Sequence, residues 1–557
     1  MEKNNRKSAV AALLAIMFSV GITVCLRAQT ALPAALAGRV SSSEEGPMEG
    51  VLVSAKRAGS TISVTVASDA QGRYTFPRNR LEPGDYTVRM RAVGYDLDDP
   101  GTVQITANKT TAVELKLHKT KDLASQLTSA EWLQSFPGTQ EQKTFLLGCT
   151  TCHTLERIAK SNHNADEWMS VFQRMTTYYP EDTPYRPQKR VYPSAGFGPP
   201  DKLRKQAEWM ATINLSSSDT WNYPLRTLPR LKGRATHVII TEYDLPRKDS
   251  VPHDLLVDSK GMIWYDDAGW QFLGKLDPKT GKVEEYPAPT FIADYPVGML
   301  DLQMDKEGNL WPAMMDQGKL AKFDTKTLKF TFWDLPKEPD LNVQQINFLM
   351  PYYSSVDGKV WTSDSNILEL RRLDIHSGKI DLYKVFDQVP GGAEGHAFYD
   401  VAADSQNNGY VMDIGGGNIV RVNAKSGKVT LFPTPTPNSG PRRGQMDPQD
   451  RLWFGEYRGN RVGMFDAREE KFQEWEAPNP WTAPYGAALD KNGEVWVNGI
   501  TTDRVQRLDP KTGKFTEYPL PRYSSIRRVG LDNSTTPVTF WTPNKNSASI
   551  IRVEPLD

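Results

Sequence analysis

Cysteine is almost absent from this chain, with three residues among 557. One of them, Cys25, lies in an N-terminal apolar stretch, which leaves Cys149 and Cys152 as a single closely spaced pair. One such pair cannot cross-link distant parts of a chain of this length, so the sequence excludes a fold built on disulfides.

Net charge is also absent, because 67 lysines and arginines balance 67 aspartates and glutamates. No overall field draws the protein to phosphate backbones, and we expect no nucleic-acid partner. Hydrophobic residues make up 39% of the chain, as in folded globular proteins, and the length exceeds what one core accommodates. The sequence therefore predicts several folded domains.

The N-terminus begins with a charged segment, residues 1–7, followed by an apolar run over residues 9–26 and then small and polar residues. This order is typical of a secretory signal peptide, which we predict over residues 1–28. The run is close to the ~18 residues that can span a bilayer, so we expect membrane contact only if the segment is retained. The protein is expected to be exported to the periplasm or the outside of a bacterial cell.

Residues 36–118 alternate apolar and polar positions in short runs separated by turn residues, which predicts a small β-sandwich. The stretches 69–76 and 81–88 resemble the carboxypeptidase regulatory-like domain, a prealbumin-like sandwich. That resemblance implies a spacer or contact module without catalytic residues.

Helical periodicity replaces this alternation over residues 129–216. Asn164 is placed to cap a helix whose Trp168, Phe172 and Met175 share one face. We expect three short helices and a long irregular loop rich in proline, tyrosine and glycine. Three short helices alone would form only a thin core, which favours a bound cofactor that fills it.

The central motif of this segment is Cys149-Thr-Thr-Cys152-His153. In a Cys-x-x-Cys-His motif the thiols form thioethers with haem vinyl groups and the histidine ligates the iron. The motif predicts one covalently bound haem c on a small all-α cytochrome c domain. Two alternatives are a zinc site, for which His163 is the nearby fourth ligand, and a thioredoxin-like pair, which normally follows a strand.

The sixth iron ligand is predicted from a second stretch, Trp-x-x-Val-x-x-x-Met, which ends at Met175. Together with the haem motif it resembles small class I-like cytochrome domains, so we take Met175 as the sixth ligand beside His153. Met210, His163 and an open position are the alternatives. Methionine ligation suits electron transfer, whereas an open position suits small-molecule chemistry.

A repeated closing phrase, such as Gly-Lys-Phe-Thr-Glu-Tyr-Pro-Leu-Pro, dominates residues 237–557. The copies end at about every 43 to 50 residues, a period that indicates a four-stranded propeller blade. They lie at residues 240–246, 281–289, 328–336, 427–435, 470–478 and 513–521, with a weaker copy at 378–384. Pairing the first phrase with residues 549–553 completes a seventh blade, so the predicted fold class is multidomain and mainly β, ending in a seven-bladed β-propeller.

Within these repeats, Pro252-His-Asp and Trp453-Phe-Gly-Glu resemble motifs of the virginiamycin B lyase family. The resemblance implies a seven-bladed propeller that opens a depsipeptide lactone by elimination, using Mg²⁺ with histidine and glutamate. Carried over by motif, these positions are His253 and Asp267. The family has a glutamate at the position of Asp267. In the blade that contains Glu456, Arg442 replaces the family histidine.

Equivalent positions in successive blades converge at one end of the central channel. We align His396, Arg442, Tyr485 and Arg527 with His253, and Asp364, Asp413 and Glu456 with Asp267. The predicted catalytic set is then His253, Asp267, His396 and Glu456, with a divalent cation at Asp364 and Asp413. The alternative is that these charges only neutralise one another at the channel mouth.

Three functions follow. The first is an exported mono-haem cytochrome for electron transfer or haem-linked oxidation, whose propeller binds a redox partner protein or a small-molecule substrate. The second is a virginiamycin B (streptogramin) type lyase acting on a lactone-like substrate, and the third is a non-catalytic recognition scaffold. The sequence leaves open whether the chain is an enzyme, either an oxidoreductase component or a C–O lyase.

Overall fold

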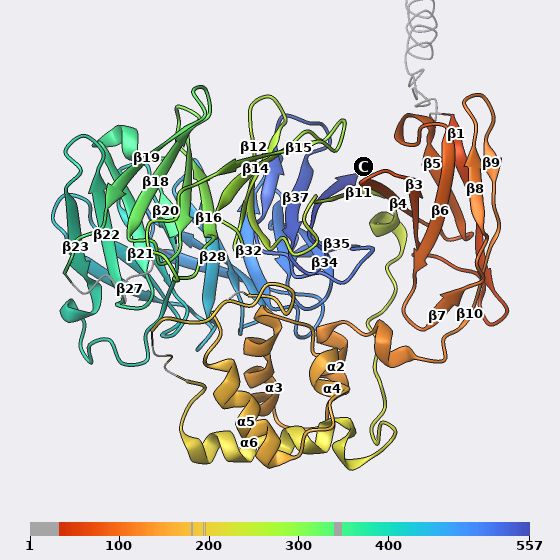
Figure 1. Ribbon diagram of the computed structural model, residues 1–557, viewed down its shortest axis with the longest axis horizontal. Helices are drawn as coiled ribbons and strands as arrows, with labels where there is room; N and C mark the ends of the chain where they lie inside the picture. The colour runs from red at the N-terminus through yellow and green to blue at the C-terminus, as the bar shows by residue number, and fades with distance from the viewer. Residues whose placement is uncertain (1–32, 180–181, 193, 195, 339–347) are drawn as a thin grey trace, which may run out of the picture.

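The computed structural model describes residues 33–179, 182–192, 194, 196–338 and 348–557, so the predicted signal peptide lies outside the described residues. The chain is multidomain and mainly β, with a sandwich, a helical segment and a propeller (Figure 1). In the part that the structure describes, no helix is long and apolar enough to cross a membrane.

The predicted β-sandwich is confirmed. Its inner positions alternate with exposed ones, as over Arg73–Pro77 and Gly84–Arg91, and Leu36, Val53, Tyr74 and Phe76 are buried in its core. The strands are β1 (Ala34–Ser42), β2 (Gly46–Pro47), β3 (Leu52–Arg57), β4 (Ile62–Ala67), β5 (Arg73–Pro77), β6 (Gly84–Arg91), β7 (Tyr95–Leu97), β8 (Thr102–Ile105), β9 (Thr111–Ala112) and β10 (Leu115–Lys119).

The helical segment contains more than the three helices expected: α2 (Ser129–Ser135), α3 (Gln140–Leu147), α4 (Glu156–Ala159), α5 (Ala165–Met175) and α6 (Pro200–Ile213). The Asn164 side chain caps α5 by accepting the N–H groups of Asp166 and Glu167, both at 3.0 Å. Trp168 and Phe172 are buried, as their shared face predicts. The helices lie against one end of the propeller (Figure 1).

The described residues of the propeller form seven four-stranded units. The first three are β12 (Pro252–Val257), β13 (Ile263–Asp267), β14 (Phe272–Leu276), β15 (Val283–Pro287); β16 (Met299–Met304), β17 (Leu310–Met314), β18 (Lys319–Asp324), β19 (Lys329–Asp334); and β20 (Phe348–Met350), β21 (Lys359–Asp364), β22 (Glu369–Asp374), β23 (Ile380–Lys384). The next three are β24 (Phe398–Ala403), β25 (Gly409–Asp413), β26 (Asn418–Val422), β27 (Val429–Pro433); β28 (Pro441–Met446), β29 (Arg451–Glu456), β30 (Arg461–Asp466), β31 (Lys471–Glu476); and β32 (Pro484–Leu489), β33 (Val495–Gly499), β34 (Arg504–Asp509), β35 (Lys514–Pro519).

The seventh unit joins the two ends of the propeller sequence. It consists of β36 (Gly530–Asp532), β37 (Thr539–Asn544), β38 (Ser549–Pro555) and β11 (Val238–Asp244). Strand β11 pairs antiparallel with β38 from Val238↔Pro555 to Asp244↔Ser549. The first closing phrase therefore completes the last blade, as the sequence predicted.

Strand β11 also pairs along its other edge with β4 of the sandwich, from Ile239↔Val66 to Tyr243↔Ile62. One eight-stranded sheet therefore runs from the propeller into the sandwich. Because the outer edge of this blade is covered by another strand, it presents no unpaired row of N–H and C=O groups there. Nothing in the repeat pattern indicated this continuity.

A hydrogen bond recurs where the first strand of a blade turns into the second. An aspartate accepts the indole N–H of the tryptophan six residues later, and also the backbone N–H groups two and four residues later. The pairs are Asp258–Trp264 at 3.1 Å, Asp305–Trp311 at 3.0 Å, Asp447–Trp453 at 2.9 Å and Asp490–Trp496 at 3.0 Å. The repeated aspartate thus fixes both the turn and the core tryptophan.

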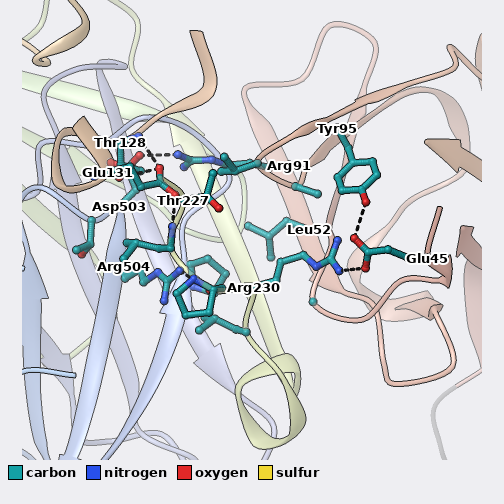
Figure 2. A pocket seen from close by; sticks show the side chains of 18 of the residues that line it. Glu45, Leu52, Arg91, Tyr95, Thr128, Glu131, Thr227, Arg230, Asp503 and Arg504 are labelled. Atoms are coloured by element: carbon teal, nitrogen blue, oxygen red, sulfur yellow. Dashed lines mark hydrogen bonds and ion pairs between the residues drawn. The ribbon is translucent and has the colours of Figure 1, made fainter. Parts of the chain in front are cut away.

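A cavity of about 290 Å³ lies where sandwich, helical segment and propeller meet (Figure 2). Arg91 of the sandwich pairs with Asp503 of the propeller at 2.6 Å. Glu131 of α2 accepts the N–H of Leu228 at 2.7 Å, and Arg230 pairs with Glu45. These contacts hold the three parts together.

Replacing Asp490 by alanine should lower the free energy of unfolding by about 2 kcal/mol, because a buried indole N–H loses its acceptor. The measurement is thermal or denaturant unfolding followed by tryptophan fluorescence. Asp509→Ala is the matched control in the same blade, since Asp509 caps an exposed turn. Equal losses in the two variants would contradict the role assigned to the indole bond.

Candidate functional site

The Cys149–His153 motif lies on a 3-10 turn, Gly148–Thr151, and the residues just after it. Cys149 and Cys152 are not joined in a disulfide, and both are half-buried, as is His153. The Nδ1 atom of His153 lies 2.9 Å from the carbonyl oxygen of Thr154. A carbonyl can only accept, so Nδ1 carries the proton and Nε2 is the ring atom with a lone pair for a metal.

Burial is the largest influence on the pKa values of Cys149 and His153. It raises the pKa of the Cys149 thiol to about 12. It lowers the pKa of His153, and the nearby cations Arg157 and Lys545 add to that effect. The histidine is therefore held neutral at physiological pH.

The turn is docked on the propeller by side chains of two blades. Tyr457, which follows β29, donates its hydroxyl to the carbonyl of Leu147 at 2.9 Å. Arg527 donates Nη2 to the carbonyl of Thr151 at 2.8 Å, and Lys545 donates to the same oxygen. No sequence pattern connected these propeller residues with the cysteine motif.

Strand register decides which residues occupy equivalent places near the channel. Pro252 pairs with Asp267, Phe398 with Asp413, and Pro441 with Glu456. The residue after each first partner is therefore equivalent between blades, which places Tyr399, and not His396, with His253. The alignment of His396 was wrong because His396 lies two residues before β24, in the preceding loop.

The equivalent residues, which we call the channel-end set, are His253, Leu300, Tyr399, Arg442, Tyr485 and, from the bridge between Ile526 and Asn544, Arg527. The Arg442 guanidinium lies over the rings of Tyr399, Tyr457 and Tyr485, at 4.6, 4.3 and 4.5 Å from their centroids. Such cation–π contacts stabilise a buried guanidinium. The alignment of Arg442 and Tyr485 with His253 agrees with the register.

The helical segment covers this end of the channel. Tyr399 and Tyr485 pack in the same hydrophobic cluster as Leu147 and Phe172, while the loop residue Tyr179 packs against Leu300. His253, of the same set, is 1% exposed. The loop after α5, which the sequence predicted only as irregular, acts as part of this cover.

A second set of buried charged residues lies beside the channel-end set. Arg443 forms a bidentate pair with Asp254, at 2.8 and 2.5 Å, and also contacts Asp301. Its Nε lies 3.7 Å from Asp400, and Arg528 lies 3.6 Å from Asp254. Each of these residues directly follows a member of the channel-end set, so the spacing along the repeats could have predicted them.

In this arginine–aspartate set, Arg443 and Arg528 pair with the carboxylates of Asp254, Asp301 and Asp400. The alternative that the channel charges only neutralise one another stays a prediction. Burial by itself would raise the pKa of Asp254, but Arg443 and Arg528 bring it well below its usual range. Burial and the neighbouring Asp254 raise the pKa of Asp266 well above its usual range.

Among the described residues, one group of three possible metal ligands has its ligand atoms within 4.8 Å of one another: His253, Asp254 and Asp266. Asp254 already holds Arg443 through both oxygens, and the raised pKa of Asp266 favours its neutral form. Mg²⁺ prefers several ionised or carbonyl oxygens in octahedral geometry. The donors present therefore do not fit Mg²⁺.

The predicted cation ligands Asp364 and Asp413 serve their own turns instead. Asp364 accepts the N–H of Asn366 at 3.0 Å, and Asp413 accepts the N–H of Gly416 at 2.9 Å. His396 lies 2.7 Å from Asp413 through Nδ1, so it too braces this turn. Neither carboxylate belongs to the three-ligand group found among the described residues, and a divalent cation at Asp364 and Asp413 stays a prediction.

Asp267 and Glu456 end the second strands of their blades. Asp267 accepts the N–H groups of Val251, Gly269 and Trp270 at 2.9–3.0 Å, and burial raises its pKa to about 7. Burial, and then repulsion by Glu474, raises the pKa of Glu456 to about 8. Their role in catalysis stays a prediction.

The candidates for a sixth iron ligand are spread over the helical segment. Met175 is half-buried at the end of α5. Met210 is 1% exposed in the cluster beside Cys149, and the His163 ring packs edge-on against Trp168. Ligation by Met175 therefore stays a prediction. The zinc alternative gains no support, because Cys149, Cys152 and His153 are outside the three-ligand group found among the described residues.

Two family models match parts of the chain. The model of the virginiamycin B lyase family matches residues 384–554, and that of the carboxypeptidase regulatory-like domain matches residues 35–118. A comparison with curated proteins finds no match.

Solved structures resemble the propeller. Virginiamycin B lyase from Staphylococcus aureus, in selenomethionine form, is 21% identical over 56% of this chain and 98% of its own, with a TM-score of 0.47. A streptogramin B lyase is 21% identical over 58% and 99%, with a TM-score of 0.49. The extracellular domain of a putative one component system from B. thetaiotaomicron is 18% identical over 57% and 45%, with a TM-score of 0.42. At these values the likeness carries no conclusion about activity, whereas the family matches establish a virginiamycin B lyase-like propeller and a carboxypeptidase regulatory-like domain.

The raised pKa of Glu456 predicts a pH-dependent loss of stability. The folded state binds this proton more tightly than the unfolded chain, whose glutamate pKa is about 4.3. The contribution of protonated Glu456 to the free energy of unfolding is fully present below that pH and is lost as the pH rises toward 8. Relative to Glu456→Gln, the wild-type protein should lose about 1.4 kcal/mol per pH unit between roughly pH 5 and 8.

Unfolding midpoints of wild type and Glu456→Gln across this range provide the measurement. Glu476→Gln, at an exposed position of the same blade, is the control and should follow the wild-type curve. Parallel curves for wild type and Glu456→Gln would show that the carboxyl is not held neutral.

Proposed function

We propose that this chain is an exported mono-haem c-type cytochrome whose propeller holds the haem segment and supplies a binding platform. Cys149 and Cys152 would hold the haem through thioethers, and His153 would ligate its iron through Nε2. The observation that carries the proposal is the Nδ1–H hydrogen bond from His153 to the Thr154 carbonyl. Histidines that ligate metals typically donate their other ring N–H in this way.

The donor set fits a haem. Two thiols outside any disulfide stand beside a neutral histidine, and the phenyl rings of Phe145 and Phe172 pack 5.5 Å apart within the apolar cluster that includes Cys149. The group, when bound, supplies reversible one-electron chemistry. The chain itself holds the turn, keeps the imidazole oriented and surrounds the site with apolar side chains, which limits water.

The covered channel end favours this function over a lyase. A lyase would need a histidine of the channel-end set to reach its substrate, yet His253 is 1% exposed beneath the helical segment and its loop. Among the described residues, the three-ligand group includes Asp254, whose two oxygens already hold Arg443. We therefore propose that the propeller presents the helical segment to a redox partner protein or a small-molecule substrate.

The test is export of the full chain in a bacterium with haem-attachment machinery. Wild type should retain haem after denaturing electrophoresis and give a reduced-minus-oxidised spectrum of a low-spin c-type haem. Cys152→Ala and His153→Ala should lose all or nearly all of this signal. His163→Ala is the control and should keep it, since His163 packs against Trp168. A wild-type protein that is exported and folded but has no haem would refute the proposal.

The lyase alternative is tested separately on a streptogramin B lactone. The haem proposal expects no ring opening above background by wild type, and none that depends on His253. Turnover by wild type that falls at least 100-fold in His253→Ala would instead establish the lyase function.

A further inference from the structure

A groove of about 1120 Å³ lies between the sandwich and the propeller. It adjoins the smaller cavity of Figure 2, because Arg91 lines both. Its volume exceeds the roughly 300–1,000 Å³ of typical small-molecule sites. The groove therefore has room for a short oligomer.

The floor of the groove is the outer face of the sheet that runs from the propeller into the sandwich. Residues paired directly across a ladder point to the same face, so four strands contribute one row of polar side chains. In order across β11, β4, β3 and β6, the row is Glu242, Ser63, Lys56 and Thr87. Arg89, two residues beyond Thr87, points to the same face. Three spacings of ~4.8 Å between strands make this row roughly 14 Å long.

The floor has no free strand edge. A peptide commonly binds a sheet by adding a strand to such an edge. In the part of the chain that the structure describes, each of the four strands is paired on both sides, in the order β38, β11, β4, β3, β6 and β8. A ligand in this groove is therefore recognised by side chains and not by backbone pairing.

Charges of both signs line the groove. Arg522 donates to Glu242 at 2.9 Å and to Asp244 at 2.8 Å, and Lys56 also pairs with Asp244. The other charged lining residues are likewise of both signs: Arg57, Arg89, Arg91, Asp96 and Asp99. A groove in which neither sign dominates favours a neutral ligand over an ion.

The exposed polar groups of the groove both donate and accept hydrogen bonds. The Arg89 guanidinium donates, the Asp99 carboxylate accepts, and the Thr87 hydroxyl does both. Sugar hydroxyls also act as donors and acceptors, so a sugar chain can pair with all three kinds of group. This chemistry favours a polyhydroxylated ligand.

Tyr523 adds an aromatic surface to the wall. Its hydroxyl donates to the carbonyl of Ser125, and the Arg91 guanidinium lies 5.2 Å from its ring centroid. These contacts hold the ring, which is half-buried where it lines the groove. A tyrosine has an apolar body beside its polar tip, and that body suits the C–H face of a sugar ring.

We propose that this groove binds a neutral oligosaccharide. Thr87 and Arg89 hydrogen-bond to its hydroxyls, and Tyr523 packs against one of its rings. The site is separate from the Cys149–His153 turn, so the inference goes beyond the proposed cytochrome function and does not depend on it.

The experiment measures binding of cellotetraose, xylotetraose, maltotetraose and laminaritetraose to the exported full chain by titration calorimetry. Wild type should bind at least one of them with a Kd below about 1 mM. Arg89→Ala and Tyr523→Leu should each weaken that binding about tenfold, because each removes one contact with the sugar. Tyr523→Phe keeps the ring and should stay within about threefold of wild type.

Arg39→Ala is the matched control, because Arg39 is an exposed arginine of β1 that does not line the groove. It should bind the sugar as wild type does. Thr87→Val is a further variant at an exposed position and should weaken binding about threefold through loss of the hydroxyl.

If none of the four sugars binds wild type more tightly than about 1 mM, the inference is overturned. Binding that is unchanged in Arg89→Ala and Thr87→Val would place the sugar elsewhere and would overturn it as well, even if Tyr523→Leu does not fold. Equal or tighter binding of tetra-alanine would assign the groove to peptides instead. A chain that binds sugar but has no haem would refute only the proposed function, and a haem-loaded chain that binds no sugar would refute only this inference.

Discussion

The pairing of β11 on both of its edges is the constraint on which the rest of the molecule depends. One edge pairs with β38 and closes the propeller, and the other pairs with β4 and joins the sandwich. Because backbone hydrogen bonds continue across both junctions, sandwich and propeller form one continuous sheet at this blade. The helical segment is inserted between them in sequence, so both of its ends are anchored to this unit.

That anchoring explains why the helical segment lies over the channel. Its turn is held by Tyr457, Arg527 and Lys545, and its loop packs against Leu300. Covering the channel buries the charges below it, and buried charges need partners. These partners are Arg443, Asp254, Asp301 and Asp400, which pair with one another. They act as a structural core, and the covered channel supports the helical segment.

Local signals in the sequence were read correctly where one residue decides one local structure. Asn164 begins a helix because its side chain accepts the first free N–H groups, and the repeated closing phrases mark outer strands. The alignment of blades by residue type failed at His396, which lies in the loop before β24. The sequence does not show whether this histidine belongs to the loop or to the strand, whereas the register of β24 with β25 does. The alignment of Asp413 with Asp267 agrees with the register, since Phe398 pairs with Asp413 as Pro252 pairs with Asp267.

By itself, then, the sequence determined the sandwich, the blade pattern, the closure of the ring by its two ends and the Cys-x-x-Cys-His motif, because each depends on residues close together in the chain or on a repeat. Only the tertiary structure decided that Arg527 and Lys545 meet the carbonyl of Thr151, nearly 400 residues away. It also decided that His253 is covered. Both depend on packing between separate domains, which no periodicity or spacing along the chain predicts.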